Sequence, residues 1–153
     1  MPRAGSNIPD FELMRFTPYR AAVVAQLLSE ALAKQYRKRF GISIPDWRVL
    51  VHLVESGGAS VRDIERRVAM EKSKVSRAAA RLEARGLIIK RVNASDRRLV
   101  HLSLTESGEK LMSELLPIAI AFQEEIEAKL GGDFKAYEDG MGKLLAEFQD
   151  LAF

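Results

Sequence analysis

Hydrophobic side chains recur every three or four residues over most of the chain, which is the spacing of one face of an α-helix. This pattern predicts a long helix over 11–40, a second from Thr105 to Leu130, and a last helix from Phe134 onward with an uninterrupted apolar stripe. Pro18 falls inside the first segment and marks either a kink or a late start of that helix. The chain is therefore expected to be mainly α-helical.

The middle of the chain predicts shorter helices that are separated by glycine, serine and proline. One helix is expected over 45–55, a short one from residue 60 to about 68, and another over 72–85. Residues 69–71 form the turn between the last two, and Gly86 is well placed to end the second. Two short helices joined by a tight turn make a helix-turn-helix.

After Gly86 the hydrophobic period changes from that of a helix to that of a β-strand. Residues 87–92 are rich in apolar and β-branched side chains, and residues 100–104 alternate between apolar and polar ones. The residues between them, Asn93-Ala94-Ser95-Asp96, are typical of a turn. The sequence therefore predicts a β-hairpin, or wing, directly after the helix-turn-helix.

Charge is informative through its distribution, because the 153-residue chain carries a net charge of only +3. Residues 1–41 hold 7 basic and 3 acidic side chains, residues 42–104 hold 13 and 7, and residues 105–153 hold 4 and 11. A basic segment of this kind is typical of a protein that binds a polyanion. A solvated helix face is the alternative explanation, and charge alone leaves it open.

The predicted helix over 72–85 has two chemically different sides. Its inner side is apolar and consists of Val75, Ala78, Ala79 and Leu82. Its outer side carries small residues, hydroxyls and cations, namely Ser73, Arg77, Ala80 and Ala84, flanked by Lys74 and Arg81. In a DNA major groove, small residues permit close approach, arginine bonds guanine O6 and N7, and lysine and serine hold phosphates. An exposed helix that its cations merely make soluble is the alternative.

The tip of the predicted wing carries Asp96-Arg97-Arg98. Arginine on a thin hairpin can enter a minor groove, where narrow A·T regions have a strongly negative potential. Asp96 can support one of these arginines through a charge-assisted hydrogen bond. Asn93, Ser95 and Asp96 can also satisfy the turn itself, and both interpretations can hold for Asp96.

From about Ile42 to Leu116 the chain resembles the MarR family of bacterial transcriptional regulators. The resemblance rests on Asp46-Trp47-Arg48-Val49-Leu50, on Lys72-Ser73-Lys74-Val75-Ser76-Arg77 with Leu82-Glu83-Ala84-Arg85-Gly86-Leu87, and on Asp96-Arg97-Arg98 with Leu102-Ser103-Leu104-Thr105 and Gly108. It implies a mainly α (α+β) fold with a winged helix-turn-helix DNA-binding domain over 42–104. An N-terminal dimerisation helix over 1–41 and C-terminal dimerisation helices over 105–153 are expected to flank this domain.

The resemblance also implies a function. Members of the family bind pseudo-palindromic DNA as homodimers, usually as repressors, and many are released by small aromatic or phenolic ligands. The recognition helix (about 72–85) is expected in the major groove and the wing (about 88–104) in the minor groove. The alternative is a winged-helix protein that uses its basic face for non-specific DNA binding or for a protein partner.

Candidate DNA-binding residues follow from the matching positions. On the recognition helix they are Ser73, Lys74, Ser76, Arg77 and Arg81. On the wing, Arg98 is the expected DNA-binding arginine, Asp96 its support, and Arg97 a further candidate. Two positions depart from the family pattern: Glu65 stands where alanine is usual, and Ala69 stands in the turn where glycine is common. These departures are expected to affect how closely the two helices approach, but not the fold.

The terminal helices carry more apolar surface than the 63-residue middle segment can cover, which predicts a second subunit. Packing of three helices within one chain is the alternative. A small aromatic acid effector would bind between the dimer helices and the DNA-binding lobe, and shift the protein toward a conformer that binds DNA less well. Candidate ligand-binding residues are Arg15, Tyr19, Trp47, Arg48 and His52. The alternative, which the sequence favours for each residue taken singly, is that Trp47 belongs to the core and Arg48 is a surface salt-bridge partner.

Several classes of site are excluded or disfavoured by composition. The chain has no cysteine, which excludes disulfides, Cys-ligated zinc and thiol-based peroxide sensing. Its two histidines, His52 and His101, lie on different predicted elements, so no metal is expected. We find no phosphate loop and no nucleophile with a base, so we expect neither an enzyme nor a cofactor. The longest apolar run, Leu115–Phe122, is too short to cross a membrane, and residues 1–10 do not resemble a signal peptide, so a bacterial cytoplasmic location is expected.

Overall fold

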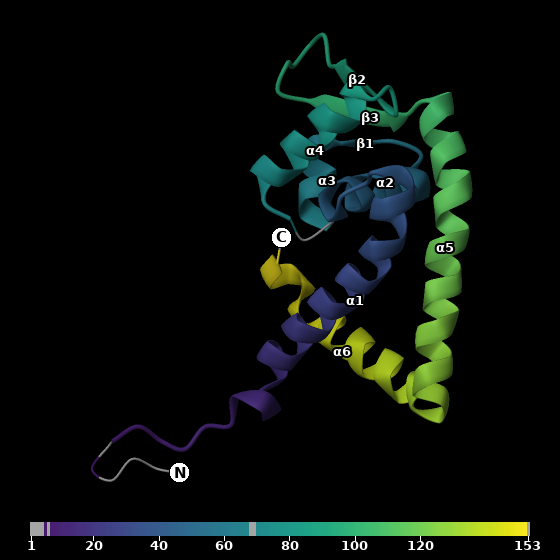
Figure 1. Ribbon diagram of the computed structural model, residues 1–153. Helices are drawn as coiled ribbons and strands as arrows, with labels where there is room; N and C mark the ends of the chain where they lie inside the picture. The colour runs from purple at the N-terminus through teal and green to yellow at the C-terminus, as the bar shows by residue number, and fades with distance from the viewer. Residues whose placement is uncertain (1–4, 6, 68–69, 153) are drawn as a thin grey trace.

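The computed structural model describes residues 5, 7–67 and 70–152, with side chains described as far as residue 149. Figure 1 shows a lobe of short helices and strands, from which two long helices, α1 (Thr17–Phe40) and α5 (Glu106–Leu130), extend away. A last helix, α6 (Phe134–Ala152), turns back from the far end of α5. The expected fold class, mainly α-helical with a small antiparallel sheet, is confirmed.

The lobe contains the predicted helix-turn-helix and the predicted wing. Helix α2 (Ile44–Ser56) precedes α3 (Val61–Arg67) and α4 (Lys72–Ala84). Residues 68 and 69 lie outside the described residues, and with them Ala69 of the predicted turn at 69–71. The wing consists of β2 (Ile88–Val92) and β3 (Val100–Leu104), paired antiparallel.

A third strand, β1 (Ala59–Ser60), was not predicted from the sequence. It pairs antiparallel with β3, with Ala59 opposite Leu102 and Ser60 opposite His101, so the strand order is β1-β3-β2. Two residues are too few to show an alternation of apolar and polar side chains. The strand follows Gly58, which has a φ of 136° and whose Cβ, if present, would lie 2.8 Å from the His101 ring. Only glycine allows this approach of the chain to the wing.

Helix α1 starts late, which decides between the two alternatives for Pro18. Phe16 has extended backbone angles, and Pro18 lies in the first turn, where its missing N–H leaves no helical bond unmade. A short 3₁₀ turn, Leu13–Arg15, precedes it, so residues 11–40 are not one continuous helix as predicted. The helix ends at Gly41, which has a φ of 64°.

Side-chain caps start two of the helices that border the lobe. Ser43 and Asp46 form a capping box at the start of α2, in which each side chain accepts a hydrogen bond from the other residue's backbone N–H. Thr105 Oγ1 accepts from Gly108 N at 3.0 Å at the start of α5. A Cβ on Gly108 would overlap the carbonyl oxygen of Leu87, so this glycine lets α5 start directly against the wing.

The hydrophobic core lies inside the lobe and includes the adjoining ends of the two long helices. Fully buried side chains come from every layer of the lobe and from Tyr36 of α1 and Leu115 of α5. The largest of those from α2, α3, α4 and the sheet are Leu50, Leu53, Ile64, Leu82, Ile88 and Leu102. Burial of these apolar surfaces holds the recognition helix and the wing in one rigid unit.

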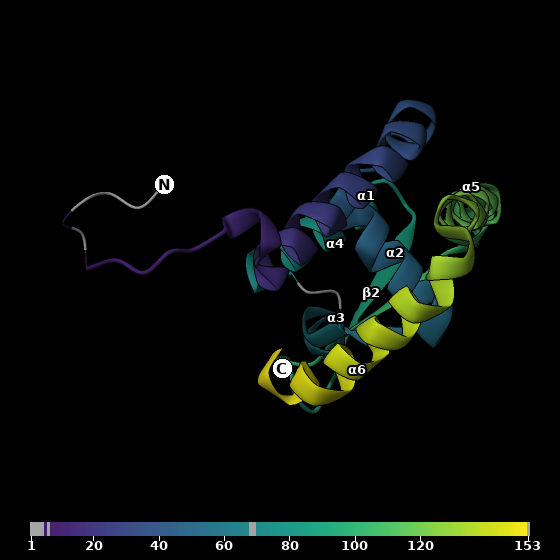
Figure 2. The ribbon, with the colours of Figure 1, turned by 90° about the horizontal axis from the view of Figure 1, so that it is seen from below.

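The far ends of the terminal helices are packed much less. Figure 2, viewed from below, shows α6 well separated from α1, although the two overlap in Figure 1. Five apolar side chains of α6 expose 37–66% of their surface: Tyr137, Met141, Leu144, Leu145 and Phe148. The side chain of Leu151, which continues this stripe in the sequence, lies outside the described side chains. The apolar stripe of α6 is therefore open to a partner.

Candidate DNA-binding surface

Helix α4 buries its apolar side and exposes its polar side, as the sequence predicts. Val75, Ala78, Ala79 and Leu82 are all buried, and α4 packs on α2 with this side. The outward positions are all exposed, namely Ser73, Lys74, Ser76, Arg77, Ala80 and Ala84. A helix with small residues, hydroxyls and cations on its exposed side has the composition that close approach to a major groove requires.

Two features prepare the start of α4 for an anionic partner. The N-cap residue Glu71 makes no side-chain hydrogen bond to the helix, which leaves first-turn N–H groups without a side-chain cap. The Arg77 guanidinium folds back over this turn, and its Nε donates to the Ser73 carbonyl oxygen at 3.2 Å. The rest of the Arg77 guanidinium remains exposed above the helix.

Arg81 makes an ion pair within the lobe, in addition to the DNA-reading role that the family pattern suggests for it. Its Nε and Nη2 both donate to Asp46 Oδ1 of α2, at 3.2 and 2.9 Å. The Asp46 side chain is almost fully buried, whereas Arg81 remains about half exposed. Because a buried carboxylate is very unfavourable without its cation, Asp46 holds Arg81 in this position, and the DNA-binding role of Arg81 stays a prediction.

The wing tip combines both roles that the sequence left open for Asp96. Asn93 Oδ1 accepts from the backbone N–H groups of Ser95 and Asp96, at 2.8 and 3.2 Å, and so closes the turn. Asp96 Oδ1 accepts from Arg98 Nε at 3.1 Å and from Arg98 N at 3.0 Å, while Oδ2 accepts from Nη2 at 3.3 Å. The predicted support of an arginine by Asp96 is confirmed, and that arginine is Arg98.

This support leaves the Arg98 guanidinium available. The Arg98 side chain is 86% exposed even though it is hydrogen bonded, and the neighbouring Arg97 is also exposed. Hydrogen bonds from Arg98 lower the pKa of Asp96, so the carboxylate stays ionised at neutral pH. The wing therefore presents an oriented cation at its tip.

Arg62 is a cation near the wing that sequence reasoning missed. It lies in the first turn of α3, and its charge also lowers the pKa of Asp96. Beside it, Ser60 Oγ accepts from Asp63 N at 3.1 Å at the start of α3, and hydrogen bonds with Ser60 lower the pKa of Asp63. Arg62 and Asp96 are brought together by the pairing of β1 with β3. The sequence did not predict this pairing, so it gave no sign that the two residues lie close to each other.

Of the two departures from the family pattern, Glu65 is the one that lies within the described residues. Glu65 on α3 is half-buried and follows the fully buried Ile64, so it is accommodated at the edge of the lobe. Ala69 lies outside the described residues, as noted above.

In the part of the chain that the structure describes, two cavities of about 330 and 270 Å³ include none of the five candidate ligand residues in their linings. Arg15 is exposed and pairs with Glu12 at 3.7 Å, and Tyr19 is exposed at the start of α1. Trp47 is half-buried and stacks on Tyr36 with 5.6 Å between ring centroids, in agreement with the core interpretation. Arg48 lies close enough to Tyr36 to influence its pKa, which burial raises to about 12.

His52 lies on α2, one helical turn after Arg48. It is buried on α2, and its Nε2 has no hydrogen-bond partner. Burial lowers its pKa, and the charge of Arg67 on α3 lowers it further, while Glu55 and Asp63 act in the opposite direction. The side chain therefore faces the interior between α2 and α3, where the neutral imidazole is favoured.

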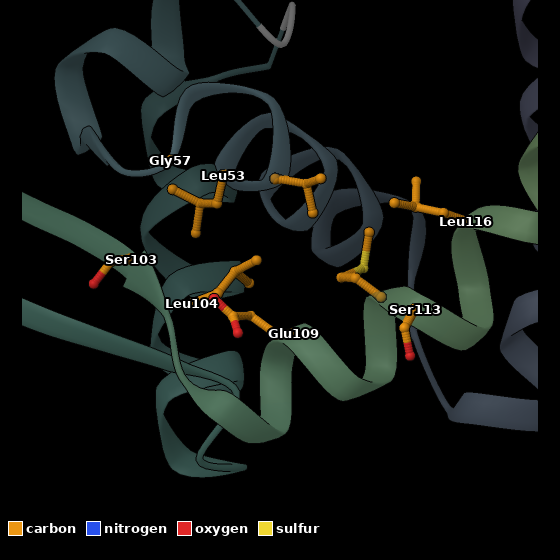
Figure 3. Close-up of a pocket in the computed structure, with 9 residues that line it drawn as sticks. Leu53, Gly57, Ser103, Leu104, Glu109, Ser113 and Leu116 are labelled. Carbon is orange, nitrogen blue, oxygen red and sulfur yellow. The ribbon is translucent and has the colours of Figure 1, made fainter.

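A cavity of about 330 Å³ lies where the lobe meets α5 (Figure 3). It is bounded by the C-terminal half of α2, the end of β3 and the first turns of α5. Its lining is mostly apolar, with Glu109 as the one charged lining residue, and includes none of the five candidates: Leu53, Val54, Gly57, Ser103, Leu104, Glu109, Met112, Ser113 and Leu116. Sequence reasoning missed this cavity because its lining comes from three separate elements.

Across residues 5, 7–67 and 70–152, no group of three His, Cys, Asp or Glu side chains is arranged to hold a metal ion. Within the same part of the chain, no helix has the length and apolar character needed to cross a membrane.

Comparison with known proteins identifies the family. A family model described as the MarR family matches residues 40–99. FarR of Neisseria gonorrhoeae, an HTH-type transcriptional regulator, is 30% identical over 105 residues, which cover 67% of this chain and 72% of FarR. The chain belongs to the MarR family. Its predicted resemblance to that family is therefore confirmed, and it is a MarR-type DNA-binding transcriptional regulator.

Two more relatives of this MarR-family protein extend the comparison. MdtR of Bacillus subtilis, an HTH-type transcriptional repressor, is 34% identical over 87 residues, which cover 57% of this chain and 53% of MdtR. The chain thus spans between about half and three quarters of the length of these curated relatives. The crystal structure of NadR in complex with 4-hydroxyphenylacetate superposes with a TM-score of 0.70 at 26% identity, covering 93% of this chain and 98% of NadR. These relatives are transcriptional regulators rather than enzymes.

Proposed function

We propose that this protein is a homodimeric repressor that reads a pseudo-palindromic operator with α4 in the major groove and the wing in the minor groove. The observation that carries the proposal is the pairing of two exposed cationic features on one rigid lobe. Helix α4 buries its apolar side and exposes Ser73, Lys74, Ser76 and Arg77, while Asp96 orients Arg98 on the wing. Phosphate contacts would fix the register of such a lobe, and Arg77 would read base edges.

The dimer is supported by the uncovered stripe of α6. Among the described residues, α6 packs mainly on the 3₁₀ turn Gly131–Asp133 that leads into it. This disfavours the alternative of three terminal helices packed within one chain. We assign 1–41 and 105–153 to dimerisation and 42–104 to DNA binding, because α1 ends at Phe40 and β3 ends at Leu104. Two recognition helices about one DNA turn apart would then match an operator with two half-sites.

An effector is the second part of the proposal. Arg48 and Trp47, which lie beside Tyr36, together with Arg15, Tyr19 and His52, remain the candidates for a small aromatic acid, and the solved NadR structure holds 4-hydroxyphenylacetate. For these residues to meet, a partner subunit has to close the space around them. Release from DNA would follow if the ligand bound better to a conformer in which the two recognition helices have the wrong separation.

The test is selection of bound DNA from a random pool, followed by affinity measurements on the enriched sequence. We expect an enriched pseudo-palindrome, and we expect Arg77→Ala to weaken binding to it by about 1–3 kcal/mol while affecting random DNA less. Lys135→Ala on α6, which removes the same charge from an exposed i,i+4 pair, is the matched control. Equal losses on both DNAs would mean that Arg77 only holds phosphate.

The same assay separates the competing functions. A pool that binds without enrichment of any sequence would support the alternative, in which the basic face serves non-specific DNA binding or a protein partner. Repeating the assay with a panel of aromatic acids tests the effector. Loss of operator binding with one acid, and retention of binding by Arg48→Ala in its presence, is the expected result.

A further inference from the structure

The C-terminal half of the recognition helix is attached to the corner between α1 and α2 by two arginines that lie one helical turn apart. The first is Arg81, whose ion pair with the buried Asp46 was described above. Asp46 uses both of its carboxylate oxygens, because Oδ1 accepts from Arg81 while Oδ2 accepts from Ser43 N at 3.2 Å. One carboxylate therefore caps the start of α2 and holds α4 at the same time.

The second arginine, Arg85, reaches the other side of the same corner. Its Nη2 donates to the Phe40 carbonyl oxygen at 3.0 Å and its Nη1 to the Gly41 carbonyl oxygen at 3.2 Å. Phe40 is the last residue of α1 and Gly41 is its C-cap. Carbonyl groups at a helix C-terminus lack helical partners and carry partial negative charge, so they are favourable acceptors for a guanidinium.

We propose that Asp46, Arg81 and Arg85 are positioning residues that set the angle between the recognition helix and α1, and thereby the operator spacing that the dimer accepts. This inference rests on the proposed function, since it assumes that α4 reads DNA in a dimer. Arg81 and Arg85 hold α4 to the only covalent connection between α1 and the lobe, which is the corner at 41–43. Movement of α1 relative to its partner is then transmitted directly to α4.

The geometry makes the position of the DNA-reading end sensitive to this attachment. Ser73 lies eight residues from Arg81, which is about 12 Å along the helix axis. A tilt of about 5° at the attachment therefore moves the Ser73 end by about 1 Å, a distance comparable to the tolerance of a hydrogen bond. Because each half-site is read by one copy of α4, the error appears as a change in the preferred distance between half-sites.

The experiment uses the full chain and the operator that the wild-type protein selects. Affinity is measured on this operator, on versions with the half-sites one base pair closer or farther apart, and on random duplex DNA. The variants are Arg85→Ala and the double variant Asp46→Asn/Arg81→Gln, which leaves no charge buried without a partner. Arg37→Ala is the charge-matched control for Arg85→Ala, because Arg37 pairs with Glu30 on the exposed surface of α1 and its loss also removes one positive charge. The double variant keeps the net charge of the wild type, so the wild-type protein is its control.

We expect the wild-type protein and Arg37→Ala to lose about tenfold or more in affinity when the spacing changes. The two attachment variants should bind the three spacings within about threefold of one another. On random DNA, Arg85→Ala should bind as Arg37→Ala does, and the double variant as the wild type does. A thermal unfolding midpoint for each variant confirms that it is folded. A purely stabilising role would lower that midpoint and leave the spacing preference unchanged.

The outcomes also separate this inference from the proposed function. If folded attachment variants keep the wild-type spacing preference, the positioning role is wrong while the proposed function stands. If the wild-type protein enriches no sequence from the random pool, the proposed function is wrong and the positioning role with it.

Discussion

Helices α4 and α6 are both amphipathic, yet the chain covers the apolar side of only one of them. In α4 the four inward residues are at most 1% exposed. In α6 the apolar stripe is just as regular, but Leu144, Leu145 and Phe148 are each at least half exposed. Amphipathic spacing therefore indicates which side of a helix will be covered, but it does not indicate whether the same chain covers it.

The two regions also differ in charge. The lobe that contains α4 is basic, and its cations are held in place by Asp46, Asp96 and backbone carbonyls. The segment from residue 105 onward has 11 acidic and 4 basic side chains, and its ion pairs are exposed and local, such as Lys135–Asp139. Ordered cations suit contact with DNA, whereas an acidic surface is expected to stay away from it.

The largest expected effect is on stability, and it tests the covered side of α4. Leu82→Ala should lower the free energy of unfolding by about 2–5 kcal/mol, because it opens a cavity in a fully buried position. Chemical denaturation at two protein concentrations provides the measurement. The matched control is Leu145→Ala on α6, which should cost less than about 0.5 kcal/mol in the monomer. Equal costs for both in the monomer would remove the contrast between the helices.

The second prediction concerns what covers α6. Leu145→Glu should split the proposed dimer, because it places a charge in the apolar interface, and light scattering should then report one 17.1 kDa chain. Operator binding should be lost with the dimer. The control is Lys143→Gln, which changes the net charge by the same amount at a position about 200° around the helix from Leu145. A wild-type protein that is already monomeric at micromolar concentration would contradict the proposed dimer.

The third prediction sharpens the contrast in charge. Arg98→Ala should reduce by about 1 the slope of log affinity against log salt concentration, because one cation near phosphate is lost. The effect on affinity at a single salt concentration should be smaller than that of Arg77→Ala. Lys135→Ala removes the same charge from α6 and should leave the slope unchanged. An unaltered slope for Arg98→Ala would mean that the wing tip does not lie near DNA.

The smallest expected effect is a pH dependence of stability that arises from His52, inside the covered lobe. Burial lowers the pKa of His52 in the folded protein, so below about pH 6.5 the unfolded chain binds a proton more readily than the folded one. Stability should therefore fall as the pH decreases from 7.5 to 5.5, and this loss should be smaller in His52→Gln. Thermal unfolding at the two pH values measures it. The control is His101→Gln, an exposed change on the wing, which should lose as much stability as the wild type does. If His52→Gln also loses as much stability as the wild type, His52 is excluded as the cause.

Sequence periodicity predicted the helices of the lobe, the two strands of the wing and the two sides of α4. The change from a helical to an alternating period located the wing, and the burial of Val75 and Leu82 agrees with the predicted inner side. The predicted boundaries of the helices were less accurate where one residue is compatible with two local structures. Pro18 is an example, because proline can start a helix as well as kink one. Strand β1 was missed because it is too short to show a period.

The sequence by itself determined the family, the helix-turn-helix with its wing, the candidate residues of α4, and the support of Arg98 by Asp96. These features depend on residues within a few positions of one another, where spacing and turn chemistry decide the structure. Only the tertiary structure decided that Arg81 binds Asp46, that Arg85 binds the end of α1, and that Arg62 lies near the wing. The partners of Arg81 and Arg85 lie 35 to 45 residues away along the chain, and such contacts form only when the buried core brings the helices together.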